Sequence, residues 1–160
     1  QHKSKDIKGY SIIGYGVSSG PEYPQYKRDL ARYNFRELRQ LKKEYKREFS
    51  KIDKLFKKAK KKGKPVIFLS HNVPFNTSLD KIVNPASPRD GDHFGSLITR
   101  RIIDKHQPKI CVGGHIHEHF GKDRIGKTTA INAGFGKYVN TLLELQGNKI
   151  KRLEFKRGKK

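Results

Sequence analysis

The chain has 160 residues, of which 33% are hydrophobic and 32% are charged, and its formal net charge is +22. This length is enough for one domain with its own core, and no apolar run approaches the roughly 18 residues that a membrane-spanning helix needs. The single cysteine, Cys111, excludes a disulfide within the chain, which is typical of proteins in the reducing cytoplasm. We therefore expect a cytoplasmic protein with no membrane partner.

The positive charge is concentrated in two segments. Residues 36–64 hold fourteen basic and four acidic side chains, and residues 149–160 hold seven and one. Segments of this kind attract phosphate-rich partners by long-range attraction and counterion release. A solubilising, lysine-rich surface explains the same composition equally well, and the excess of Lys over Arg favours diffuse attraction over bidentate recognition.

The first half of the chain predicts a strand, a loop and a long helix. Residues 10–16 read as a short strand that ends in glycine, and residues 17–24 are rich in Ser, Gly and Pro. Apolar residues then recur at spacings of three and four over residues 35–62, with Asn34 as the N-cap and Gly63 as the stop. Because the apolar stripe is narrow, one side of this helix should pack while the lysine-rich remainder faces solvent or a partner.

The second half predicts strands that alternate with one more helix. Residues 65–70 form an apolar strand, and after a long loop a helix covers residues 94–105, which Pro108 prevents from continuing. The apolar run 110–112 is the next strand. Short β segments separated by glycines follow at residues 128–132, 138–145 and 149–155. This order of elements indicates a layered α/β fold.

Three histidines follow two of the predicted strands. His71 comes directly after residues 65–70, and His115 and His117 follow the run 110–112 and two glycines. In an extended segment the side chains at i and i+2 point the same way, so His115 and His117 would reach into one cleft. Imidazoles at such positions bind first-row metal ions, although histidines at strand ends also occur as ordinary core or turn residues. Three of them in this arrangement favour a metal site.

The segments Ser70-His71-Asn72-Val73-Pro74 and Gly114-His115-Ile116-His117 resemble the later motifs of the calcineurin-like metallophosphoesterases. The similarity, to a prokaryotic and archaeal branch, covers most of residues 64–148. It implies an α/β fold, namely the second half of a layered β-sandwich flanked by helices. It also implies two divalent ions, manganese in the first place and iron, zinc or nickel as alternatives. His71 and His115 would bind one ion and His117 the other.

The earlier motifs of that family, Asp-x-His, Gly-Asp-x-x-Asp and Gly-Asn-His-Asp/Glu, do not occur in this sequence. We therefore expect residues 1–148 to be the C-terminal part of a metallophosphoesterase domain and residues 149–160 its last strand and a basic tail. The implied activity is metal-dependent hydrolysis of a phosphate mono- or diester. Its bridging carboxylate and general acid would come from a missing N-terminal half, so this segment alone would be inactive.

An alternative function is a non-catalytic domain of the same fold. It would associate with nucleic acid or a ribonucleoprotein through the lysine-rich helix and the basic tail. Salt-sensitive binding that does not need His115 would favour this alternative.

Several other residues invite a functional interpretation. Residues 121–128 match the Walker A pattern, but no apolar strand precedes them and no helix follows, so we expect no phosphate-binding loop. Cys111 lies in a predicted buried strand, where a packing role is favoured over a ligand role. His93 should lie at the start of the second helix. There it either lies near the substrate or has a structural role, and the structural role is favoured. Exposed structural positions are expected for the remaining histidines, which are His2, His106 and His119.

Overall fold

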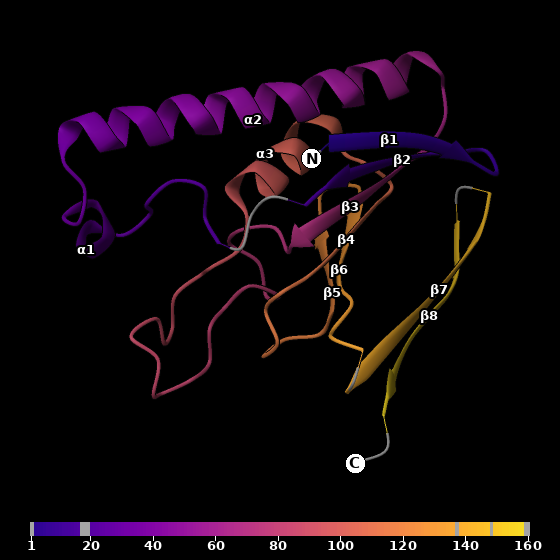
Figure 1. Cartoon of the computed structure of the whole chain (residues 1–160). Coiled ribbons are helices and arrows are strands. Elements are labelled where there is room, and N and C mark those ends of the chain that lie inside the picture. Colours follow the sequence, from indigo (N-terminus) through magenta and orange to yellow (C-terminus); the bar gives the residue numbers. More distant parts are fainter. Residues whose placement is uncertain (1, 17–19, 137, 148, 159–160) are drawn as a thin grey trace.

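The computed structural model describes residues 2–16, 20–136, 138–147 and 149–158, and its centre is a six-stranded sheet (Figure 1). The strands of this sheet are β1 (His2–Ile7), β2 (Tyr10–Tyr15), β3 (Val66–Asn72), β4 (Ile110–Gly114), β5 (Gly121–Ile125) and β6 (Thr128–Asn132). They lie in the order β1-β2-β3-β4-β6-β5. The four inner strands are parallel, and each edge strand is antiparallel to its neighbour. The carboxyl ends of β2, β3, β4 and β6 therefore meet at one edge of the sheet.

Helices cover one face of this sheet. They are α2 (Phe35–Lys61) and α3 (Leu97–His106), and α2 contacts both α3 and the sheet, whereas the short helix α1 (Lys27–Leu30) lies near the start of α2 and away from the sheet (Figure 1). Inward side chains of α2 meet the sheet where the rings of Phe56 and Phe68 pack edge to face, 5.1 Å apart. The predicted long helix is confirmed, since Asn34 and Glu37 form a reciprocal capping box at its start.

The second helix begins three residues later than predicted. Its N-cap is Ser96, whose side chain accepts a hydrogen bond from the amide of Thr99. The amide of Gly95 instead donates to the carboxylate of Asp80, which keeps the preceding residues out of the helix. The position predicted for His93, at the start of the helix, is therefore wrong.

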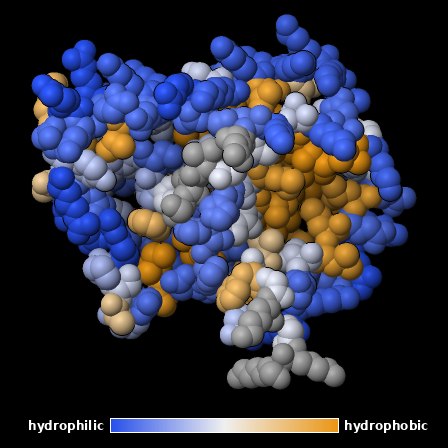
Figure 2. Space-filling model, in the orientation of Figure 1, coloured by the Kyte–Doolittle hydropathy of each residue, from blue (hydrophilic) through white to orange (hydrophobic). Residues whose placement is uncertain are grey.

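The other face of the sheet is apolar and partly open. Two rows of paired residues cross it, one through Ile12, Ile67 and Ile110 and one through Leu69, Val112 and Ile131. Leu69 is 43% exposed. A two-stranded sheet of β7 (Val139–Gln146) and β8 (Lys149–Arg157) stands apart from the six-stranded sheet, and Figure 2 shows a broad hydrophobic area on the same side of the molecule. The two sheets are the expected layers of an α/β sandwich.

The Walker A-like stretch is a β-hairpin. Strand β5 pairs with β6 from Gly121 to Ile125, and Ile125 lies opposite Thr128 across a tight turn in which Gly126 has a φ of 58°. No helix follows, so the expectation that these residues do not form a phosphate-binding loop is confirmed. The sequence patterns did not predict the two antiparallel edge strands, β1 and β5. The loop predicted at residues 17–24 lies partly outside the described residues.

Two histidines expected at the surface are largely buried. The side chain of His106 is only 9% exposed, because its ring stacks on Phe56 and its Nε2 lies 2.7 Å from an oxygen of Asp53. The ring of His2 stacks on Tyr15. Cys111 is fully buried, as expected for a packing role, and burial raises the pKa of its thiol. Among the described residues, no helix combines the length and apolar character needed to cross a membrane.

Candidate metal centre

Two of the three predicted ligands meet at the carboxyl edge of the sheet. Strands β3 and β4 run parallel and end together, with Asn72 opposite Gly114. This pairing brings the exposed side chains of His71 and His115 into contact, with Nε2 of His71 3.1 Å from Nδ1 of His115. The ring centroids are 4.9 Å apart.

Gly113 permits this close approach of the two strands. A Cβ atom at this position would lie 2.9 Å from the carbonyl oxygen of Asn72, closer than real Cβ atoms come to backbone. The register between β3 and β4 also shifts between Leu69 and Asn72. Such an irregularity re-aims a side chain at the end of a strand, in this case that of His71.

His115 has an unusual backbone conformation. Its φ is 71°, in the left-handed region, and the amide of Ile116 donates to the carbonyl of Gly114, 2.9 Å away. A hydrogen bond between residues i+2 and i around a central residue with positive φ is a strained γ-turn, which is rare. Strain of this kind costs about 1–3 kcal/mol and is concentrated at functional sites. It aims the imidazole of His115 back toward His71.

His117 is not with the other two imidazoles. Its ring stacks on Phe135, with the centroids 4.1 Å apart. His115, His117 and Phe135 line an open cleft of about 480 Å³, together with Ile82, Ile116 and Glu118. The expectation that residues 115–117 are extended is wrong, because β4 ends at Gly114 and the γ-turn follows. Within the described parts of the chain, no group of three or more His, Cys, Asp or Glu side chains is arranged to hold a metal ion.

The two imidazoles in contact fit a divalent ion. Metal–nitrogen bonds of about 2.0–2.1 Å place two ligands of one four- or six-coordinate ion roughly 2.9–3.4 Å apart. The observed nitrogen separation of 3.1 Å lies within this range.

Asp80, which sequence reasoning did not single out, organises the loop after β3. Its carboxylate is fully buried and accepts hydrogen bonds from the amides of Asn76, Thr77 and Gly95. It also lies 2.8 Å from Nδ1 of His93, so His93 is held in place by Asp80. The only signal for Asp80 in the sequence was its place within residues 64–148, most of which share the family resemblance.

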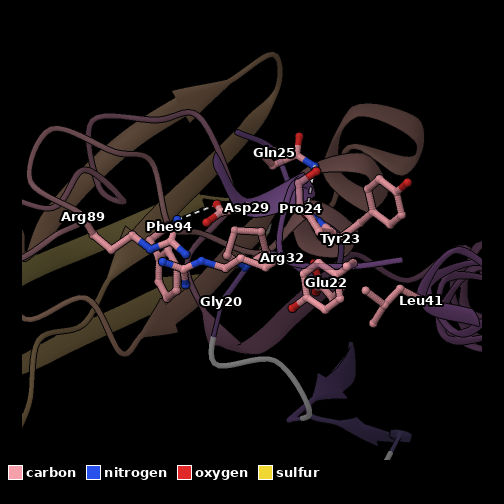
Figure 3. Close-up of a pocket in the computed structure, with 12 residues that line it drawn as sticks. Gly20, Glu22, Tyr23, Pro24, Gln25, Asp29, Arg32, Leu41, Arg89 and Phe94 are labelled. Atoms are coloured by element: carbon pink, nitrogen blue, oxygen red, sulfur yellow. Dashed lines mark hydrogen bonds and ion pairs between the residues drawn. The ribbon is translucent and has the colours of Figure 1, made fainter. Parts of the chain in front are cut away.

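A second cavity lies between the loop before α1 and the first half of α2. Its volume is about 300 Å³, and Figure 3 shows Glu22, Leu41, Arg89 and Phe94 around it. Glu22 accepts hydrogen bonds from the amides of Leu97 and Ile98 at the start of α3. Among the described residues no histidine lines this cavity, and Asp29 in its wall is paired with Arg89.

Comparisons with known proteins identify the family and the fold of the chain. A sequence model of the calcineurin-like phosphoesterases matches residues 4–119. An uncharacterised protein of Methanocaldococcus jannaschii is 38% identical over 72 residues, which are 43% of this chain and 31% of that protein. The superposition with one solved crystal structure covers 98% of this chain and 52% of the chain in that structure, with a TM-score of 0.63. At 17% sequence identity this match supports the fold alone. The crystal structure of TT1561 of Thermus thermophilus covers 96% of this chain and 56% of its own, with 18% identity and a TM-score of 0.46. The chain thus spans about half the length of these solved structures and a third of the curated relative.

Proposed function

Because the chain belongs to the calcineurin-like phosphoesterase family, we propose that it contributes to the metal-dependent hydrolysis of a phosphate mono- or diester. The observation that supports this function is the 3.1 Å separation of His71 Nε2 and His115 Nδ1 at the open carboxyl edge of the sheet. A neutral imidazole has one unprotonated nitrogen, and two such nitrogens can bind one ion.

In this proposal His71 and His115 hold one divalent ion and His117 the second. Manganese is the first choice, and iron, zinc and nickel are alternatives. When bound, two such ions activate water and stabilise the charge that develops on a phosphoryl group. This chain orients the ligands through the γ-turn at His115 and the β3–β4 pairing, while the cleft of about 480 Å³ beside His117 leaves room for a phosphoester.

Within the described residues, no group of three or more His, Cys, Asp or Glu side chains is placed to hold a metal ion. Neutral ligands alone compensate the charge of two dications poorly, because hard divalent cations prefer anionic oxygen ligands. We propose that the carboxylates and the general acid come from a polypeptide segment outside this chain, which spans 52% of a solved structure of the same fold. On its own, the chain should bind metal weakly and show no turnover.

The experiment is a Mn²⁺ titration of residues 1–160, followed by electron paramagnetic resonance, with a parallel assay of bis(p-nitrophenyl) phosphate hydrolysis. We expect weak Mn²⁺ binding that is lost in His115→Ala, and no hydrolysis. Binding unaffected by His115→Ala would contradict the metal site. Turnover at the rate of an intact family member would contradict the need for an outside segment but not the metal site.

A further inference from the structure

The outer side of α2 carries a straight row of cations, which we call the basic ridge. Its members are Arg36, Lys43, Arg47, Lys54, Lys58 and Lys61. A residue advances 100° around an α-helix, so these side chains lie within about 40° of one line. That line is opposite Ile52, Phe56 and Ala59, which are buried against the sheet and α3. At 1.5 Å per residue, the basic ridge is about 38 Å long.

The acidic side chains of α2 do not interrupt the basic ridge, because they lie about 80–120° away from its line, on the flanks of the helix. Glu37 completes the capping box, and Glu44 accepts a hydrogen bond from Gln40 at 2.6 Å. Glu48 binds Lys51 at 2.8 Å, and Asp53 binds Lys57 at 2.9 Å. In the ridge only Arg47 takes part in an ion pair with the described residues, a 3.3 Å contact with Glu48 that leaves its side chain 64% exposed. The ridge charges are therefore not neutralised within this part of the chain.

Packing holds the basic ridge straight along most of its length. The second half of α2 is anchored by Phe56 and by Asp53, which binds Lys105 and His106 of α3. At the middle of the helix, the guanidinium of Arg101 lies 4.6 Å from the ring of Phe49, and in the first half Leu41 lines the cavity shown in Figure 3. In Figure 1 no other element lies beyond the outer side of α2, and Figure 2 shows hydrophilic side chains there.

We propose that the basic ridge binds the phosphate backbone of a duplex nucleic acid without reading its sequence. A rigid line of cations about 38 Å long spans one helical turn of a duplex, which is about 34–36 Å. The ridge carries no aromatic side chain on which the bases of a single strand could stack. Phe35, the first residue of α2, is 82% exposed, but the other large apolar side chains of the helix lie on its packed side, so the ridge offers no row of apolar side chains for insertion into a bilayer.

This proposal does not depend on the proposed hydrolysis. Helix α2 packs on one face of the sheet, where the ring of Phe56 contacts that of Phe68. His71 and His115 lie instead at the carboxyl edge of the sheet. Binding to the basic ridge should therefore persist in EDTA and in His115→Ala.

The test measures binding of fluorescein-labelled 20-base-pair DNA and RNA duplexes to residues 1–160 by fluorescence anisotropy, in EDTA, from 50 to 300 mM NaCl. The ridge variant replaces all six ridge residues by Gln, which preserves helix propensity. A matched control with the same net charge replaces six exposed lysines outside α2 by Gln. These are Lys3, Lys5, Lys8, Lys122, Lys127 and Lys156.

We expect the wild type to lose about a thousandfold in affinity between 50 and 200 mM salt, as six phosphate contacts require. The ridge variant should bind about a hundredfold more weakly at 100 mM salt, and its slope of log K against log salt should be about five smaller. The matched control should stay within about threefold of the wild type. If circular dichroism shows that either six-residue variant is unfolded, two triple variants replace them. The ridge variant is then Arg47→Gln/Lys54→Gln/Lys58→Gln, and the control is Lys3→Gln/Lys122→Gln/Lys127→Gln.

Equal losses in the ridge variant and the control would overturn the proposal, because they would show that net charge alone is responsible. Absence of duplex binding by the wild type would overturn it too. The proposal would also be overturned if the ridge variant lost sedimentation with phosphatidylserine vesicles at 150 mM salt but bound the duplexes as well as the wild type does. Preference for the DNA or the RNA duplex would identify the partner and support the proposal.

Discussion

Nε2 of His71 and Nδ1 of His115 lie 3.1 Å apart although 44 residues separate them in the chain. The parallel pairing of β3 with β4 and the γ-turn at His115 produce this contact. Since neither imidazole is buried, the pair can be tested by substitution without large effects on the fold.

Removal of either member of this pair should weaken metal binding. We expect His71→Ala and His115→Ala each to reduce Mn²⁺ affinity at least about tenfold, because one of two fixed ligands is lost, with little change in melting temperature. Titration calorimetry measures the affinity. His106→Gln is the control, since His106 packs on Phe56 and α2, and an equal effect in this variant would argue against the assigned ligands.

Phe135 competes for His117. The two rings stack 4.1 Å apart, and such contacts contribute about 0.5–1.5 kcal/mol. Phe135→Ala should therefore release His117 and raise Mn²⁺ affinity up to about tenfold. Phe120→Ala, which removes a ring that contacts Phe155 instead, serves as the control. Weaker Mn²⁺ binding in Phe135→Ala alone would show that the ring supports His117 rather than restrains it.

Adjacent glycines in β4 should respond differently to a methyl group. In Gly113→Ala the new Cβ would lie 2.9 Å from the carbonyl oxygen of Asn72, so we expect a loss of about 2 kcal/mol in unfolding free energy and weaker Mn²⁺ binding. In Gly114→Ala the nearest atom is 3.7 Å away, an ordinary contact, and the loss should be small. Urea denaturation of both variants checks this difference. Equal stabilities would mean that the strand ends can move apart freely.

Asp53 should make stability depend on pH in the acid range. Burial alone would raise the pKa of Asp53, but hydrogen bonds from Lys105, Lys57 and His106 more than offset this effect and lower it. A carboxyl group with a lowered pKa in the folded state stabilises the protein above its unfolded pKa of about 3.9, and this contribution is lost as the pH falls toward the folded value. Asp53→Asn should therefore cost about 2 kcal/mol at pH 5, and the difference should shrink between pH 4 and pH 2. Urea denaturation over this range measures it, and a constant difference would contradict the assignment.

Local patterns in the sequence predicted much of the fold. The apolar periodicity of residues 35–62 and the capping residue Asn34 correspond to α2, and the apolar runs at 65–70 and 110–112 correspond to β3 and β4. These features were predictable because helix caps and strand alternation depend on neighbours within a few residues. The placement of three histidines near strand ends was visible for the same reason, although His71 lies within β3 and not after it.

By itself, the sequence determined the layered α/β class, the helices α2 and α3, the inner strands, and which imidazoles stand near strand ends, but not the short helix α1. Only the tertiary structure decided that His71 touches His115, that His117 turns to Phe135, and that Asp80 holds His93. These contacts depend on the pairing of strands that are distant in sequence and on the backbone turn at His115. Next to this turn, Gly113 packs closely against Asn72. Side-chain direction at the end of a strand follows from such long-range packing, which local periodicity does not encode.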